Sequence, residues 1–314
     1  MEKVRVQDDL FHYVNGEWLE TAVIPDDKPT AGGFAELRLG VEDLLMKEYE
    51  DMSVSGEYPS EYVKNSVLLY KQILDTKKRD ELGIKPVQAK LDAILALKDI
   101  NDFNAHLTEF VLNGMPLPFN VSVDEDMKDT THYCIFVDGP SVILPDTTYY
   151  KEEMAEQKEK LLGVWSKMVE TILAKTSLSK KEQKQFIEDA LKFDESLAPL
   201  VLSHEEASEY TKMYNPYKLS RVNSLLKPVA YKKMINEIFG DVETIIVAEP
   251  RYYKGFKTVF NEETFENYKH WAYINLLLGS CSILTEELRE LSAQYRLTLM
   301  GVAKIPEIKR KRFL

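Results

Sequence analysis

The chain has 314 residues, and 40 Lys and Arg against 52 Asp and Glu give it a formal net charge of −12. Hydrophobic residues make up 44% and charged residues 29%, which is typical of a soluble globular protein with one large or two medium domains and argues against long disordered stretches. An acidic surface repels phosphate groups, so we expect no nucleic-acid partner.

The two cysteines, Cys134 and Cys281, have no metal-binding spacing. We interpret them as small buried residues in a reducing compartment, although the sequence leaves one long-range disulfide open. The first residues contain no apolar run of signal-peptide length, and no stretch approaches the roughly 18 apolar residues of a membrane span. We therefore expect a cytoplasmic protein without a membrane partner.

Helical periodicity dominates the sequence, and the first third contains four helical patterns. Their apolar residues recur at steps of three and four. The predicted helices cover residues 34–49, 60–80, 87–97 and 102–113.

Strand patterns follow directly. Residues 118–126 and 132–139 alternate in the two-residue period and contain β-branched and aromatic residues. The polar residues between them are suited to a turn, so this part of the chain predicts a β-hairpin.

The middle of the chain returns to helical patterns. One apolar stripe predicts a helix over residues 161–173. A capping-box pattern, with Ser179 and Glu182 three residues apart, predicts the start of another helix that reaches at least Leu197.

The last third contains two short helical patterns, one strand pattern and the longest helical pattern of the chain. Gly279 and Ser280 are expected to divide or bend the long pattern. The predicted helices cover residues 218–226, 231–239 and 262–300, and the predicted strand covers residues 244–247.

One stretch, "LSHEEASEY", begins like the zinc-protease motif H-E-x-x-H. That motif needs two His side chains four residues apart, so that both reach one ion from the same helix face. Here the residue four positions after His204 is Ser208, a poor zinc ligand. We interpret the stretch as an acidic turn on a solvated helix face.

The sequence contains few other signs of a catalytic or binding site. The five histidines lie far apart, and neither phosphate-binding glycine loops nor a G-x-S-x-G sequence occurs. Acid/base carboxylate pairs remain open, because 52 acidic residues offer many pairs. The basic run at 309–312 is interpreted as a solvated end or helix cap rather than a nucleic-acid patch.

The segment "DDLFHYVNGEWLETAVIPDDKPTAGGFAEL" resembles the opening of the neprilysin-like zinc metalloendopeptidases. In physical terms, Gly16 would permit a turn, the aromatic residues would anchor a chain that wraps another surface, and Pro25 would fix an extended exit. The matching landmarks are Asp9, Phe11, Tyr13, Gly16, Trp18, Leu19, Ile24, Pro25, Gly32 and Phe34.

Further landmarks follow in the order of that family. "VDGPSVILPDTTYY" is similar to a family segment that leads from a strand into a long helix, and "YNPYKLS", "VAEPRYY" and "YRLTLMG" match later positions. The landmarks in the first of these are Asp138, Pro140, Pro145, Tyr149 and Tyr150. The resemblance spans nearly the whole chain, whereas the family continues for roughly as many residues again.

The resemblance implies a mainly α fold, namely a multi-helix lid-type lobe with a small β-hairpin that lacks the thermolysin-like catalytic lobe. Residues 1–33 would cross toward that absent lobe, and residues 34–314 would form the lid, incomplete at its carboxyl end. The paired cysteines of secreted relatives are replaced around Val14 and Asn15, which fits a bacterial cytoplasmic oligopeptidase type. Thr30 stands where some relatives carry an arginine that holds the substrate carboxylate.

For function, the resemblance implies the amino-terminal half of a zinc metalloendopeptidase that hydrolyses short peptides. The family's zinc ligands and catalytic Glu lie in H-E-x-x-H and E-x-x-x-D sequences that are missing here, so this chain would carry no catalytic residue and no metal ligand. Its partners would be short peptides and its own carboxyl-terminal catalytic lobe, and its substrate-binding residues stay unknown.

Two alternatives remain open. One is a standalone helical peptide-binding or scaffolding protein, and the other is an unrelated enzyme whose metal site is assembled from distant residues. A lid without its catalytic lobe would also expose a docking face, so we expect self-association of this chain.

Overall fold

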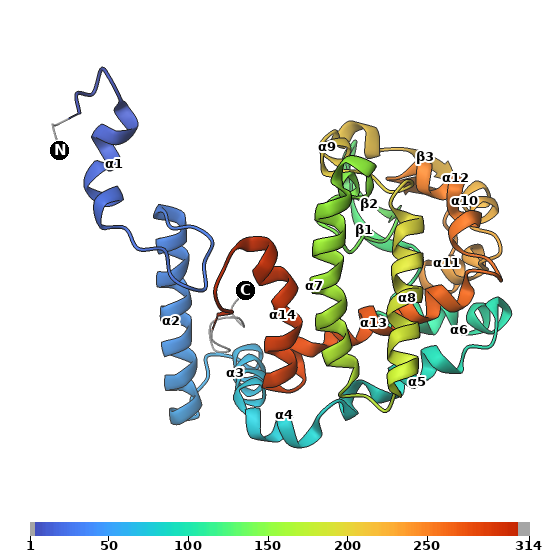
Figure 1. Cartoon of the computed structure of the whole chain (residues 1–314), viewed down its shortest axis with the longest axis horizontal. Helices are drawn as coiled ribbons and strands as arrows, with labels where there is room; N and C mark the ends of the chain where they lie inside the picture. Colours follow the sequence, from blue (N-terminus) through green and yellow to red (C-terminus); the bar gives the residue numbers. More distant parts are fainter. Residues whose placement is uncertain (1–3, 307–314) are drawn as a thin grey trace. The chain divides into compact units, whose positions relative to one another are not determined.

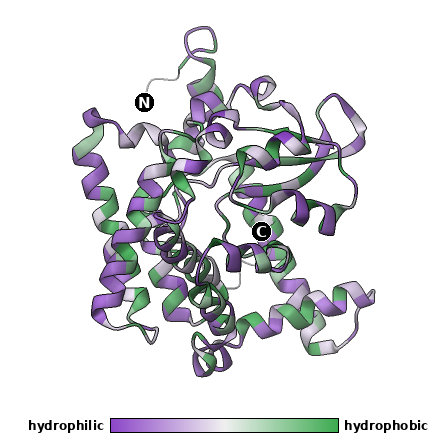
Figure 2. Ribbon diagram, turned by 90° about the vertical axis from the view of Figure 1, so that its right-hand side faces the viewer, coloured by the Kyte–Doolittle hydropathy of each residue, from purple (hydrophilic) through white to green (hydrophobic). Residues whose placement is uncertain are grey.

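The computed structural model describes residues 4–306, whose regular structure is mainly helical with one four-stranded sheet (Figure 1). The chain divides into two compact units. We call Leu82–Ser292 the central unit, and Met1–Glu81 together with Ala293–Leu314 the terminal unit. Along most helices hydrophobic and hydrophilic residues alternate, as expected of amphipathic helices (Figure 2).

In the described part of the terminal unit, all regular secondary structure is helical. Its helices are α1 (Leu10–Thr21), α2 (Gly33–Ser55), α3 (Glu61–Leu74), most of α4 (Thr76–Leu82) and the end of α14 (Glu286–Met300). Helix α2 ends at Gly56, whose φ of 72° lies in the left-handed region that favours glycine. The helix predicted over 60–80 is interrupted at Asp75, which separates α3 from α4.

Helix α1 was not expected from the sequence. Asp9 caps it by accepting a hydrogen bond from the backbone N–H of His12 at 2.9 Å. Gly16 lies inside this helix with a negative φ, so the predicted turn at Gly16 is wrong. The capping aspartate outweighs the single helix-weakening glycine.

The central unit holds the sheet and the larger core. Its helices are α5 (Lys85–Ala96), α6 (Ile100–Leu112), α7 (Ala155–Leu173), α8 (Lys180–Leu197), α9 (His204–Ala207), α10 (Leu219–Leu225), α11 (Tyr231–Phe239), α12 (Pro250–Val259) and α13 (Phe265–Ser280). Short 3-10 turns lie at η1 (Thr147–Tyr150), η2 (Glu152–Met154), η3 (Tyr210–Met213) and η4 (Cys281–Ile283).

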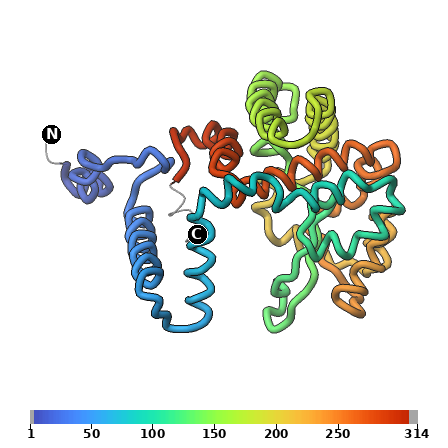
Figure 3. Tube along the Cα trace, turned by 90° about the horizontal axis from the view of Figure 1, so that it is seen from below, coloured from blue at the N-terminus to red at the C-terminus, as the bar shows by residue number. Residues whose placement is uncertain are grey.

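The sheet has the strand order β1-β2-β4-β3. Its strands are β1 (Asn120–Asp126), β2 (Asp129–Asp138), β3 (Pro216–Lys218) and β4 (Thr244–Val247). The predicted hairpin is confirmed as β1 and β2, which pair antiparallel and extend beyond the surrounding helices (Figure 3). Strand β4, which the sequence predicted, runs parallel to β2 and antiparallel to β3. Strand β3 was not predicted from the sequence.

Helices α8 and α13 pack against each other in the core of the central unit. The ring centroids of Phe193 and Trp271 lie 5.0 Å apart, and those of Phe193 and Tyr268 lie 5.8 Å apart. The predicted capping box of Ser179 and Glu182 is present at the start of α8. The predicted break near Gly279 and Ser280 is also confirmed, because α13 ends there and α14 follows η4.

Glu249, just before α12, connects three segments of the central unit. Its two carboxylate oxygens accept the backbone N–H groups of Gly139 and Leu202, both at 2.8 Å. Burial raises the pKa of this carboxyl group. Two tyrosines of α12 add to the joint, since Tyr252 donates to the carbonyl of Pro118 at 2.5 Å and Tyr253 to that of Asp138 at 3.3 Å.

Both cysteines are free, with Cys281 buried and Cys134 half-buried. Within residues 4–306, no helix is long and apolar enough to cross a membrane.

The joint at Glu249 generates a stability prediction. A Cβ added at Gly139 would lie 2.7 Å from Val201 Cγ1 and 2.8 Å from Glu249 Oε2. We expect Gly139→Ala to lower the free energy of unfolding by about 1–3 kcal/mol, because the site has no room for a methyl group. Urea denaturation followed by circular dichroism measures this change.

The matched control is Gly163→Ala in α7, where an added Cβ meets no atom within 4 Å. This variant should gain about 0.5–1 kcal/mol, because alanine stabilises a helix interior relative to glycine. Equal effects of the two substitutions would contradict a tight contact at Gly139.

Candidate functional site

The "LSHEEASEY" stretch forms the short helix α9 and its caps, as the sequence interpretation expected. Ser203 and Glu206 make a capping box, and the guanidinium of Arg251 binds both carboxylate oxygens of Glu206 at 2.8 and 2.9 Å. This pairing, with Arg251 as its largest cause, lowers the pKa of Glu206 to about 2. The side chain of His204 is 84% exposed. The stretch therefore braces α9 against α12.

No metal centre is formed by the part of the chain that the structure describes. Across residues 4–306, no three His, Cys, Asp or Glu side chains gather so that they could hold a metal ion. These residues therefore do not fit a zinc site, which normally takes at least three protein ligands.

The landmarks that follow β2 are held by a second buried carboxylate. Asp194 of α8 accepts hydrogen bonds from the hydroxyl of Tyr150 and, at 2.7 Å, from the backbone N–H of Ile143. Its residue exposure is 1%, and this burial raises its pKa to about 6. Asp194 thus fixes the path of the chain between β2 and α7.

The other landmarks of this segment surround the same path. Asp138 accepts from the side-chain amide of Asn120 at 2.6 Å, and burial raises the pKa of Asp138. Pro140 is buried and borders a cavity of about 390 Å³ that Met115 and Trp271 also line. The remaining two, Pro145 and Tyr149, are half-buried.

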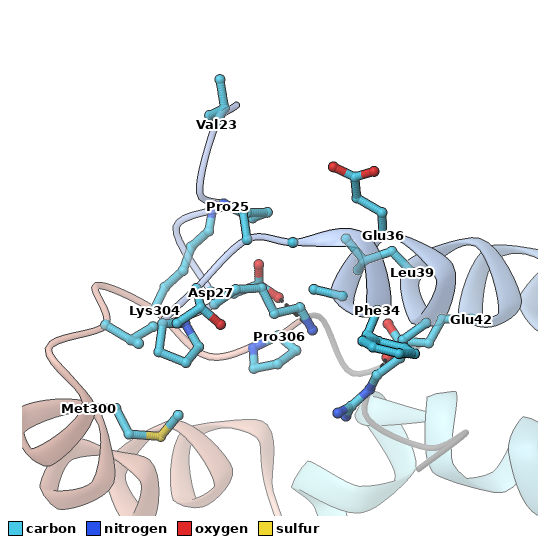
Figure 4. Close-up of a pocket in the computed structure, with 18 of the residues that line it drawn as sticks. Val23, Pro25, Asp27, Phe34, Glu36, Leu39, Glu42, Met300, Lys304 and Pro306 are labelled. Atoms are coloured by element: carbon cyan, nitrogen blue, oxygen red, sulfur yellow. Dashed lines mark hydrogen bonds and ion pairs between the residues drawn. The ribbon is translucent and has the colours of Figure 1, made fainter. Parts of the chain in front are cut away.

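Three of the amino-terminal landmarks, Pro25, Gly32 and Phe34, line a cavity of about 750 Å³ in the terminal unit. It lies between the loop after α1, the first turns of α2, the end of α14 and residues 302–306, with Pro25 and Phe34 among its lining residues (Figure 4). Gly32 and Thr30 also border it.

Charged groups lie around this mostly apolar cavity. Lys304 pairs with Asp26 at 3.2 Å at its edge, and the guanidinium of Arg38 contacts Glu42 at 3.2 Å. Glu42 is only 2% exposed and is the one buried residue of α2. The cavity could therefore accept an apolar side chain next to a charged or polar group.

The landmarks of α1, among them Tyr13, Gly16 and Trp18, lie outside this cavity. Trp18 connects α1 to α2, because its indole Nε1 donates to the carboxylate of Glu36 at 2.8 Å. Tyr13 is exposed. A Cβ added at Gly16 would meet no neighbouring atom within 4 Å, so no close contact requires glycine there. The structure thus separates the predicted landmarks into a group in the terminal unit and a group along the chain from β2 to α7.

Sequence reasoning missed Asp194 and Glu249, which hold the second group, and Arg251, which joins α12 to α9. Asp194 had a detectable signal, because it lies on the apolar stripe of α8, four residues after Ala190. An acid on a buried stripe indicates a carboxylate with specific partners. Glu249 and Arg251 had no such signal, since their partners are distant in sequence.

The raised pKa of Asp194 predicts an unusual pH dependence. Because the folded-state pKa of about 6 exceeds the ordinary 3.8, the stability that this group contributes is fully present below pH 3.8 and is lost as the pH rises through 6. Asp194→Asn should remove this loss, so the variant should gain up to about 3 kcal/mol relative to wild type between pH 4 and pH 7. Urea denaturation at each pH measures the difference.

Glu206→Gln serves as the control of opposite sign. The pKa of Glu206 is depressed, so its contribution is present above pH 4.5 and is lost as the pH falls toward 2. A pH-independent difference between Asp194→Asn and wild type would show that Asp194 is not a buried ionisable group.

Comparison with known proteins relates these features to a family. The amino-terminal-domain model described as Peptidase family M13 matches residues 6–313. The chain is 35% identical over 300 residues to a neutral endopeptidase of Lactococcus lactis, covering 95% of this chain and 47% of that protein.

Solved structures show the same relationship. The crystal structure of PepO from Lactobacillus rhamnosis superposes with a TM-score of 0.91 at 26% identity, over 99% of this chain and 49% of that one. The zinc metalloprotease Zmp1 of Mycobacterium tuberculosis shares the fold, with a TM-score of 0.85 at 21% identity over 99% of this chain and 48% of that one. The chain spans about half the length of these relatives.

These matches confirm the neprilysin-like resemblance and the mainly helical fold that it implied. Since the family model accounts for nearly every residue of the sequence, the chain belongs to peptidase family M13.

Proposed function

We propose that this chain is the substrate-confining, amino-terminal part of a zinc-dependent endopeptidase that hydrolyses short peptides in the cytoplasm. Its membership of peptidase family M13 carries the proposal. The names of its relatives support it, because one is a neutral endopeptidase and another a zinc metalloprotease. By itself the chain does not cleave peptides.

The central unit supports a confining role. Its core is formed by large buried aromatic residues, and the carboxylates of Glu249 and Asp194 fix its loops through backbone hydrogen bonds. A lobe that limits access by size must keep its shape when substrates press against it, and buried hydrogen-bonded carboxylates provide such rigidity. Its role is therefore steric.

The terminal unit supports docking of a catalytic lobe. Most of the exposed large hydrophobic side chains of the described residues lie in this unit, among them Phe34, Val54 and Tyr62. Exposed apolar surface on this scale is typical of an interface rather than of a free monomer. The proposed partner is the carboxyl-terminal lobe that the longer relatives contain.

Zinc belongs to that lobe in this proposal. Since the described residues do not form a zinc site, the ligands would come from residues of the partner lobe. This chain would contribute confinement of the peptide and no group that touches the reacting atoms.

The alternative is a standalone helical peptide-binding or scaffolding protein. The cavity of about 750 Å³ favours it, because its volume and apolar lining suit a small ligand or a peptide side chain. The two proposals differ in whether a catalytic lobe exists.

The test begins with the coding sequence downstream of codon 314. We expect an open reading frame with H-E-x-x-H followed by E-x-x-x-D, whose full product binds one zinc and hydrolyses short fluorogenic peptides but not folded proteins. Purified residues 1–314 with added zinc should show no hydrolysis. Hydrolysis by the chain alone would contradict the proposal, and a stop codon without a partner gene would favour the binding protein.

A further inference from the structure

We infer that the free edge of β1, together with a pocket at the beginning of that strand, binds an extended basic peptide. The peptide adds to the sheet antiparallel to β1, places basic side chains near the end of β1 and inserts one large apolar side chain into the pocket. This binding goes beyond the proposed hydrolysis, because the central unit alone supplies every residue of the site.

Strand β1 forms one edge of the four-stranded sheet. The strand order β1-β2-β4-β3 leaves its second side without a strand partner among the described residues. The hairpin of β1 and β2 extends beyond the surrounding helices (Figure 3). Alternate residues of an edge strand point their backbone N–H and C=O groups outward, which is the template for adding an extended peptide. Because residues 122–125 are all exposed, this edge is open to such a peptide.

A pocket of about 390 Å³ lies at the beginning of β1, and we call it the β1 pocket. Its lining includes Asn120 and Val121 of β1, Met115 and Leu117 of the preceding loop and Trp271 of α13. An added strand runs about 4.8 Å from its neighbour, so a side chain opposite Asn120 reaches this pocket. A pocket of this size and mostly apolar lining suits an aromatic or long aliphatic side chain.

Trp271 gives the β1 pocket an unused hydrogen-bond donor. The residue is only 6% exposed, and its ring centroid lies 5.0 Å from that of Phe193. Its indole N–H makes no hydrogen bond within residues 4–306, yet it is not among the fully enclosed polar atoms. A buried tryptophan normally satisfies this donor. Since Trp271 lines the β1 pocket, a carbonyl of a peptide bound there supplies the missing acceptor.

Two carboxylates without a counter-charge lie near the other end of β1. Asp124 and Glu125 are exposed, and neither makes an ion pair within the described residues. The nearby cations of the hairpin are engaged elsewhere. Lys128 Nζ lies 4.7 Å from the ring centroid of Tyr214, and His132 Nδ1 contacts a neighbouring aspartate at 2.9 Å. Basic side chains of a bound peptide complement the two carboxylates.

The length of β1 sets the spacing within the peptide. Asp124 and Glu125 follow Asn120 by four and five residues, which is about 13 to 17 Å along a strand. Antiparallel pairing is slightly more stable per residue than parallel pairing, so the basic residues come four and five positions before the apolar one. The same carboxylates repel acidic strands, including a second copy of a chain with a net charge of −12.

Isothermal titration calorimetry on residues 1–314 tests the inference with the acetylated and amidated peptide Lys-Lys-Thr-Val-Thr-Phe. We expect one site with a Kd of about 100 μM or tighter at low salt. Replacing both lysines with glutamate, or the phenylalanine with alanine, should weaken binding at least about 10-fold. Equal affinity for the acidic peptide, or no binding of the basic one, would overturn the inference.

Two backbone-methylated forms of the peptide test strand addition. Successive amides of an added strand point to opposite sides, so only alternate N–H groups donate to β1. Methylation of the valine nitrogen and of the following threonine nitrogen should therefore differ. One should abolish binding, and the other should leave the Kd within about threefold. Equal effects of the two methyl groups would refute pairing with β1.

The double variant Asp124→Asn/Glu125→Gln tests the charge recognition, with Glu152→Gln/Glu153→Gln as the matched control. The control pair also consists of adjacent exposed acids of the central unit. The first variant should bind the basic peptide about fivefold to tenfold more weakly, whereas the control should change the Kd less than about twofold. Equal effects of the two variants would show that only the net charge attracts the peptide, which contradicts a site on β1.

Ser141→Phe tests the β1 pocket. Ser141 is exposed and lines this pocket, so an aromatic ring at this position occupies the space of the peptide side chain. The variant should bind the phenylalanine and alanine peptides within about twofold of each other, with circular dichroism as the check of folding. A preference for phenylalanine that survives in the folded variant would place the side chain elsewhere and overturn the assignment of the pocket.

The whole protein provides the last test. Where the coding sequence continues past codon 314, the full-length product should bind the same peptide with a Kd within about threefold of that of residues 1–314. Loss of binding there would show that the second half covers the edge of β1, which would overturn the inference. Hydrolysis is measured separately, so this binding and the proposed function can fail independently of each other.

Discussion

The central unit depends on one interaction, the buried carboxylate of Glu249, which joins three of its segments. It accepts backbone N–H groups from the end of β2 and from the loop after α8, while its own position fixes the start of α12. Burying a carboxylate is costly unless its oxygens are fully hydrogen-bonded, so the two donors and Glu249 require one another. The lack of space for a side chain at Gly139 follows directly from this arrangement.

The same principle organises the segment between β2 and α7. Asp194 provides the second buried carboxylate, and Tyr150 and Ile143 provide its donors. The family landmarks in this segment therefore lie on a stretch of chain whose path Asp194 fixes. The landmarks Pro25, Gly32 and Phe34 lie instead around a cavity in a unit with little core of its own.

Local signals in the sequence predicted local structure well. The capping box at Ser179, the hairpin pattern and the break near Gly279 all depend on residues within a few positions of one another, and all three are confirmed. The sequence could not show that β3 and β4 complete the sheet, because strand order depends on contacts between distant segments. Glu249 was missed for the same reason, and α1 was missed because Gly16 was interpreted as a turn and the cap at Asp9 was not recognised. The predicted boundary after residue 33 stays a prediction.

The parallel pairing of β2 with β4 has a consequence for how the chain acquires its structure. All of the chain from η1 to α11 lies between these two strands in sequence, so their pairing closes a very long loop. Contacts of this kind slow folding, because the entropy of closing the loop is lost before the contacts form. During synthesis on a ribosome, the hairpin emerges long before β4 and must wait with the β4-facing edge of β2 unpaired. The exposed charges of β1 and of the hairpin turn would help to keep that waiting hairpin from pairing with other chains.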